Sequence, residues 1–165
     1  CGHSRTGHIV DGQPLVELIR NLVQGKLTAV PGTAKHWLPL VTVDYLVELV
    51  AVCAFDPAMV GQELLALDDQ TPNLRELLVQ VAQPLGLKSP KHYISLRLLK
   101  LLLSIPPVAR ILNTKPEALD FIQITRFDTA AVEQFANRYG IVKPDIRESL
   151  QHTATFVNSY CITKG

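Results

Sequence analysis

The stretch Thr71-Pro-Asn-Leu-Arg-Glu-Leu-Leu-Val-Gln-Val-Ala-Gln-Pro-Leu-Gly86 contains the clearest folding signal in the chain. Thr71 is expected to be the N-cap of a helix, with Pro72 at its first position and Gly86 at its end. Between them, apolar residues recur at helical spacing on one face: Leu74, Leu77, Leu78, Val81 and Leu85. Such a face is buried against other elements in a folded protein, so this stretch favours a packed, helix-rich fold.

Further helices and short strands are expected on both sides of this stretch. Helices are predicted from about residue 15 to Gly25, from Thr42–Asp44 to Phe55, over 96–105 and 116–121, from Asp128 to Gly140, and after Pro144. The helix that begins near Asp44 is apolar on almost every side, so we expect it to be the most buried, with Asp44 as a helix cap. Strand-like runs lie at 27–30, 62–67 and 91–96. These elements predict a single α+β domain over 1–165, helix-rich, with three or four short strands.

Composition excludes several classes of protein. The chain has 165 residues, 47% of them hydrophobic, and a net charge of +1, which excludes a disordered chain and a full two-domain enzyme. Its basic residues are scattered, so no nucleic acid is expected as a partner. The longest apolar run, 49–55, is too short for an integral membrane span. Three dispersed cysteines (Cys1, Cys53 and Cys161) and the lack of a signal peptide predict a cytoplasmic location.

The candidate motifs for chemistry in this chain are weak. His3 and His8 lack partners in metal-ligand register, so we expect no metal site. Tyr160 and Lys164 have the Y-x-x-x-K spacing of short-chain dehydrogenases, but no dinucleotide fingerprint or phosphate-binding loop occurs in the chain. We therefore treat this pair as a coincidence and assign no catalytic residue here.

Four segments, in order, carry a resemblance to a known family. Gly2-His-Ser-Arg-Thr-Gly7 is similar to the G-D/H-S-R/K-T-G segment that follows the sixth Rossmann strand in reductases, and Leu40-Val-Thr-Val-Asp44-Tyr-Leu46 resembles L-V-P-V-D-Y-V. The run 62–68 followed by 71–77 is similar to a strand and a T-x-x-E-L helix, and 127–150 to the family's closing pattern. Together they resemble the C-terminal, substrate-binding part of an extended short-chain dehydrogenase/reductase, of the NAD-dependent epimerase/dehydratase or male-sterility (thioester-reductase-like) type.

This resemblance implies a substrate-binding lobe that lacks the main Rossmann sheet. In the family, the cofactor fingerprint and the Tyr-Lys pair precede the G-D/H-S-R/K-T-G segment, so the N-terminal cofactor domain is absent from this chain. The lobe alone is then expected to be inactive and to bind no cofactor, while NAD(P) is implied for the full-length protein. The start at Cys1, without a methionine, agrees with a piece of a longer protein.

The resemblance also implies the residues that border the substrate. The candidates for the substrate-binding or cofactor-edge site are Gly2, His3, Ser4, Arg5, Thr6, His36 and Trp37. The loop 2–7 would border the nicotinamide, although a turn that needs glycine, with Arg5 in solvent, explains it equally. Trp37 stands where related sugar-nucleotide enzymes place an arginine, which favours an acyl-type small-molecule substrate; simple packing is the alternative.

The leucine-rich helix over 96–105 allows several roles. It could line an acyl pocket, dock on a membrane surface, form a subunit contact, or pack in the core. An alternative reading of the whole chain is a stand-alone helical protein-interaction module that uses this helix. A lobe separated from its Rossmann partner would expose apolar surface, so we also expect the chain to self-associate.

Overall fold

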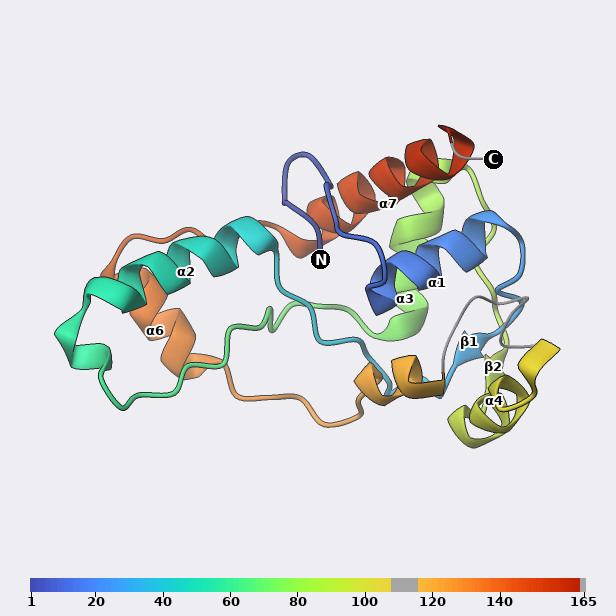
Figure 1. The fold of residues 1–165 in the computed structure, drawn as a ribbon, viewed down its shortest axis with the longest axis horizontal. Coiled ribbons are helices and arrows are strands. Elements are labelled where there is room, and N and C mark those ends of the chain that lie inside the picture. Colours follow the sequence, from blue (N-terminus) through green and yellow to red (C-terminus); the bar gives the residue numbers. More distant parts are fainter. Residues whose placement is uncertain (108–115, 164–165) are drawn as a thin grey trace.

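The structure is a computed structural model and describes residues 1–107 and 116–163 (Figure 1). Short α-helices dominate the described parts of the chain. The α-helices are α1 (Pro14–Val23), α2 (Val43–Phe55), α3 (Leu74–Ala82), α4 (Leu96–Leu103), α6 (Ala130–Arg138) and α7 (Ile146–Thr163). The remaining elements are the strands β1 (Val30–Pro31) and β2 (Tyr93–Ile94) and the 3₁₀ helices η1 (Pro57–Met59), η2 (Gln83–Leu85) and η3 (Pro116–Phe121).

The larger core lies where α1, α3 and α7 pack together, and the long helix α7 contacts both of the others (Figure 1). Ile19 of α1, Leu77 and Leu78 of α3, and Leu150 of α7 have no exposed surface. The apolar stripes predicted for these helices are therefore the surfaces that meet.

Helix α3 begins later than the sequence suggested. Its N-cap is Asn73, whose side-chain oxygen accepts a hydrogen bond from the Glu76 N–H at 3.2 Å. Thr71, the expected cap, is instead 1% exposed within the preceding turn. Either residue type can cap a helix, so local sequence did not separate them. The end of the helical stretch agrees with the prediction, because Gly86 takes a left-handed φ of 65° after η2.

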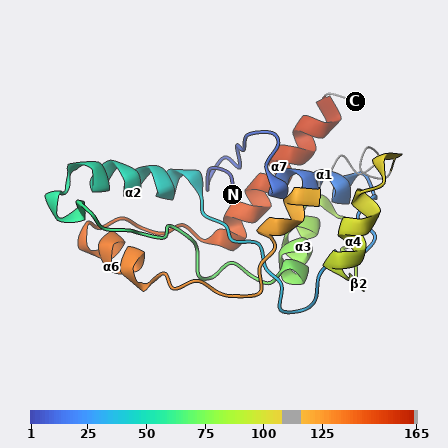
Figure 2. The same cartoon turned by 60° about the horizontal axis from the view of Figure 1, so that its bottom comes forward.

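A second, smaller core lies at the other end of the molecule, between α2 and α6 (Figure 1 and Figure 2). Tyr45 and Leu49 of α2 are buried there, whereas Val47 and Val50 are each 59% exposed. The prediction that this helix is the most buried is therefore wrong. The helix packs against this core on one side only, so its opposite apolar face stays in solvent.

The sheet is smaller than expected. β1 and β2 pair in parallel, with Val30 opposite Tyr93 and Pro31 opposite Ile94. The run 62–67 forms no strand: the Leu67 N–H donates to Leu65 O and the Gln62 N–H to Met59 O, which are local contacts. The described residues thus confirm the helix-rich fold class but contain two strands rather than three or four. None of the described helices is both long enough and apolar enough to cross a bilayer.

Candidate functional site

The loop that carries most of the predicted site residues is a closed turn against α7. The Gly7 N–H donates to His3 O at 2.8 Å, and the His3 N–H donates to His8 O at 3.0 Å. Gly7 has a φ of 68°, and a Cβ there would lie 2.1 Å from the carbonyl oxygen of His152. Only glycine fits at this point, so the glycine of the turn is explained by its close approach to α7.

Ser4 joins the loop to the first turn of α2. Its N–H donates to Oδ1 of Asp44 at 2.9 Å, and its hydroxyl donates to Oδ2 at 2.5 Å. Burial by itself raises the pKa of Asp44, but hydrogen bonds, first among them the two from Ser4, outweigh it and hold that pKa below its ordinary value. Asp44 therefore binds the loop as a carboxylate instead of acting as the helix cap that its position suggested.

His152 holds the same loop from the opposite side. Its Nδ1 lies 2.7 Å from Ser4 O, and since a carbonyl oxygen only accepts, the imidazole carries a proton on Nδ1. Asp44 and His152 were both missed as partners of the loop. They lie 40 and 148 residues away from Ser4 in the sequence, so no local pattern connects them.

Two of the remaining side chains bond to the backbone of the loop itself: Nδ1 of His3 accepts from the Arg5 N–H at 3.3 Å, and Oγ1 of Thr6 accepts from the His8 N–H at 3.4 Å. Arg5 and Thr6 are exposed and His3 is half-buried. Arg5 forms no ion pair with any residue in the described parts of the chain. The loop therefore exposes the guanidinium of Arg5 and part of the imidazole of His3, while its backbone is held by α2 and α7.

His36 and Trp37 lie in a different environment. The ring of Trp37 is 2% exposed, its Nε1–H donates to Thr125 O at 3.1 Å, and the guanidinium of Arg126 lies 4.1 Å from the ring centroid. His36 is also buried, with Nδ1 bonded to Thr33. The backbone of Trp37 pairs with the backbones of Asn73 and Gln123. The stretch that contains His36 and Trp37 therefore connects segments that are distant in the sequence. Their role at a substrate site stays a prediction.

The loop residues do not form a cradle for a dinucleotide. The Cβ positions of Gly2 and Gly7 are filled by this chain's own backbone, at 2.5 Å from Gly7 O and 2.1 Å from His152 O. The N–H and hydroxyl of Ser4 are both bonded to Asp44. These residues therefore do not fit a pyrophosphate. Lys164 of the Y-x-x-x-K pair lies outside the described residues, and the described part of the chain contains no group of three or more metal-ligating side chains.

Comparisons with known proteins give one clear result, at the level of fold. No protein-family model matches the chain, and no curated protein does. A solved structure, the terminal R domain from the myxalamid PKS-NRPS biosynthetic pathway, matches 99% of this chain with a TM-score of 0.68 and 17% sequence identity. The chain spans 42% of the length of that R domain. At this identity the likeness shows the fold alone: the chain has the helix-rich fold that was expected, that of part of this R domain.

Proposed function

We propose that this chain is the substrate-binding portion of an NAD(P)-dependent reductase and works with a Rossmann domain that it does not itself contain. The observation that carries the proposal is the match of almost the whole chain to 42% of an R domain. In this proposal the rest of the reductase supplies the cofactor site and the Tyr-Lys pair. The chain 1–165 is one lobe, inactive on its own.

The loop 2–7 supports the same assignment. It is fixed by Asp44 and His152, and Arg5 and Thr6 are exposed. A rigid backbone that presents exposed polar groups suits the rim of a cleft between two domains, because its side chains need little ordering when a ligand arrives. In the proposed reductase, this loop borders the substrate and the edge of the cofactor.

The first experiment separates the lobe from a self-sufficient enzyme. Isothermal calorimetry of the 165-residue chain with NADPH should show no stoichiometric binding, and the open reading frame should encode a G-x-x-G-x-x-G fingerprint and an internal Y-x-x-x-K upstream. Tight binding of NADPH by the chain alone would overturn the proposal.

The second experiment tests the loop in the complete protein encoded by that frame. Arg5→Ala should raise the KM for NADPH or for the substrate about tenfold, the size of one charge-assisted contact. Arg97→Ala, which removes an exposed arginine from α4, serves as the matched control and should leave both values unchanged.

A second candidate function uses the outer face of α4. Leu98 and Leu101 are 49% and 65% exposed, and Ile105, just after the helix, is 46% exposed, as expected of a segment that docks on a partner protein. A reading frame that begins immediately before Cys1 would favour this interaction module over the reductase lobe.

A further inference from the structure

A groove with a volume of about 360 Å³ lies between α2 and α6, at the opposite end of the molecule from α4 (Figure 1 and Figure 2). Tyr45 of α2 forms one wall, and the others come from α6 and the turn 140–143. None of its lining residues belongs to the loop 2–7 or to α7. Its volume falls within the range of small-molecule sites, roughly 300–1,000 Å³.

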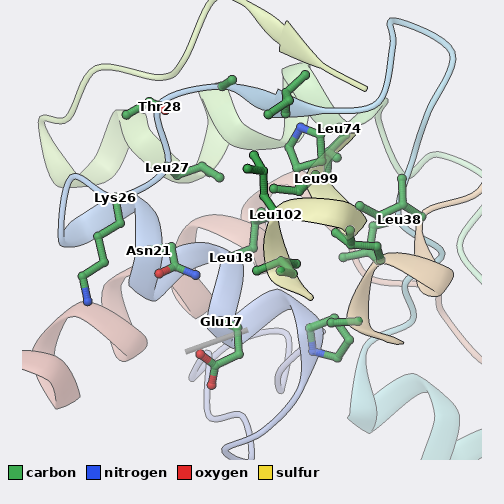
Figure 3. Close-up of a pocket in the computed structure, with 18 residues that line it drawn as sticks. Glu17, Leu18, Asn21, Lys26, Leu27, Thr28, Leu38, Leu74, Leu99 and Leu102 are labelled. Carbon is green, nitrogen blue, oxygen red and sulfur yellow. The ribbon is translucent and has the colours of Figure 1, made fainter. Parts of the chain in front are cut away.

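The groove differs in polarity from the cavity beneath α4 (Figure 3). Mostly aliphatic side chains, among them Leu99 and Leu102, line that cavity. The groove instead combines a short apolar strip with four polar side chains, those of Tyr45, Glu133, Asn137 and Lys143. It therefore suits a small molecule that carries a polar or charged group and a short apolar part.

The hydroxyl of Tyr45 has no hydrogen-bond partner among the described residues, although the residue is only 3% exposed. Buried tyrosine hydroxyls usually have one. Burial raises the pKa of Tyr45, so the hydroxyl keeps its proton at neutral pH, while its oxygen can still accept a hydrogen bond. The charges of Lys143 and Glu133 act on the same pKa in opposite directions, which places the hydroxyl near both of these groove residues. This unused hydroxyl marks a position for a polar atom of a ligand.

The charges around this hydroxyl are in excess on the negative side. The ammonium of Lys143 is paired with Asp69, and its Nζ lies 3.6 Å from Oε1 of Glu133. Oε2 of Glu133 has no hydrogen bond or ion pair with the described residues. The charge of Asp68 also acts on Tyr45 and on Lys143. Because Asp69 neutralises Lys143, the groove favours a cation over an anion.

We propose that this groove binds the ammonium group of a small alkylamine. The ammonium donates hydrogen bonds to Oε2 of Glu133 and to the hydroxyl oxygen of Tyr45, and the alkyl part lies against Ile141 and Val142. An organic ammonium fits better than a metal ion, because the described part of the chain contains no group of three or more metal-ligating side chains. The proposal concerns this groove alone and does not depend on the proposed reductase function.

Three ligands with the same butyl chain length test the charge of the occupant. In titrations of the 165-residue chain at pH 7, followed by amide NMR shifts, butylamine should bind saturably, and butan-1-ol and butyrate should bind about tenfold more weakly or worse. The shifts should lie at Tyr45 and over 133–143, whereas Leu99 and Leu102 of the cavity in Figure 3 should not respond. Tighter binding of butyrate or butan-1-ol, or no saturable shift in the groove, would overturn the proposal.

Removing the two acceptors provides the second test. Glu133→Gln should weaken butylamine binding about tenfold, whereas Glu148→Gln, which removes an exposed carboxylate of α7 outside the groove, should leave it unchanged. Tyr45→Phe should weaken binding about threefold to tenfold without lowering the thermal stability, because the hydroxyl has no partner in the chain to lose. This second variant keeps the ring in the core and decides the matter if Glu133→Gln does not fold. Unchanged affinity in either folded variant would refute the assignment.

Removing the competing cation provides the third test, with an effect of the opposite sign. Lys143→Gln should tighten butylamine binding about threefold to tenfold, because the freed carboxylates then face the ligand. Lys35→Gln makes the same change in net charge at an exposed lysine outside the groove and is the control. Weaker butylamine binding in folded Lys143→Gln, accompanied by a loss of butyrate binding, would show that the groove takes an anion and would contradict the proposal.

Discussion

The hydrogen bonds between Ser4 and Asp44 depend on pH because Asp44 accepts them as a carboxylate. The carboxylate of Asp44 accepts hydrogen bonds from both the N–H and the hydroxyl of Ser4, and its pKa lies below 3.8. A group with a lowered pKa in the folded state stabilises the fold above its unfolded pKa, and this contribution is lost as the pH falls through the folded value. The contact is therefore complete at neutral pH and fades below about pH 4.

Ser4→Ala should reduce the free energy of unfolding at pH 7 by about 1.5–3 kcal/mol, the usual contribution of a hydrogen bond to a charged group. The difference from the unaltered chain should shrink between pH 4 and pH 2 as Asp44 takes up a proton. Urea denaturation at several pH values measures both effects. Thr6→Ala, in the exposed part of the same turn, is the control and should change stability little; an equal loss at pH 7 and pH 2 would contradict the assigned role of Asp44.

At this scale the sequence predicted the loop but not its anchors. The glycines of Gly2–Gly7 predict a turn, whereas its place near a site is implied only by the resemblance to the G-D/H-S-R/K-T-G segment. Asp44 was interpreted as a cap because it follows an extended run at the start of a helix, where local rules apply. Its bond to Ser4 depends on how the loop crosses α2, which only the packed structure determines.

Among the elements, α3 has one buried face and one face that meets solvent. Leu77 has no exposed surface, whereas Val79, two residues later, is 46% exposed. The two side chains lie on the same helix and differ in burial, so they provide a matched pair.

Leu77→Ala should lower the free energy of unfolding by about 2–5 kcal/mol, because the substitution leaves a cavity between α3 and its neighbours. Val79→Ala should lower it by less than about 1 kcal/mol, since its side chain already meets water. Thermal unfolding followed by circular dichroism compares the two. Similar losses from both variants would mean that α3 does not pack as described.

Periodicity predicted most of the helices, and two of the three predicted strand-like runs, 27–30 and 91–96, overlap β1 and β2. The stretch that forms α3 has one apolar face and one polar face, so spacing alone identified both the helix and its buried side. Helix α2 is apolar all round, and spacing could not show which side would be covered. The run 62–67 has the residue types of a strand, but a strand also needs a neighbour, and the described chain supplies none beside it.

The whole molecule is divided into two packed regions, one around α7 and one between α2 and α6 (Figure 1). The second region leaves a continuous apolar stripe on α2. Val43, Val47 and Val50 follow one another at helical spacing and are 42%, 59% and 59% exposed. Phe55 at the end of the helix is 88% exposed. A surface of this kind favours contact with another protein surface.

Without another domain to cover it, this stripe should cause the 165-residue chain to self-associate. Light scattering should give a mass above 18.2 kDa that rises with concentration. The double variant Val47→Lys, Val50→Lys should restore the monomer mass, because like charges oppose the contact. Val142→Lys changes a valine outside α2 that is 80% exposed and should not restore the monomer mass. A monomer at every concentration in the unaltered chain would contradict the expectation.

The contact of the loop 2–7 with α7 also bears on the order in which the chain folds. Ser4 and His152 are separated by 148 residues, so their contact closes a loop that includes nearly every element. The entropy lost on closing a loop grows with its length, and contacts this distant in sequence slow folding. Asp44 can hold the turn as soon as α2 has formed, but the second anchor arrives only with α7. The loop 2–7 is synthesised well before α7 and is thus among the last segments of this chain to reach its final position.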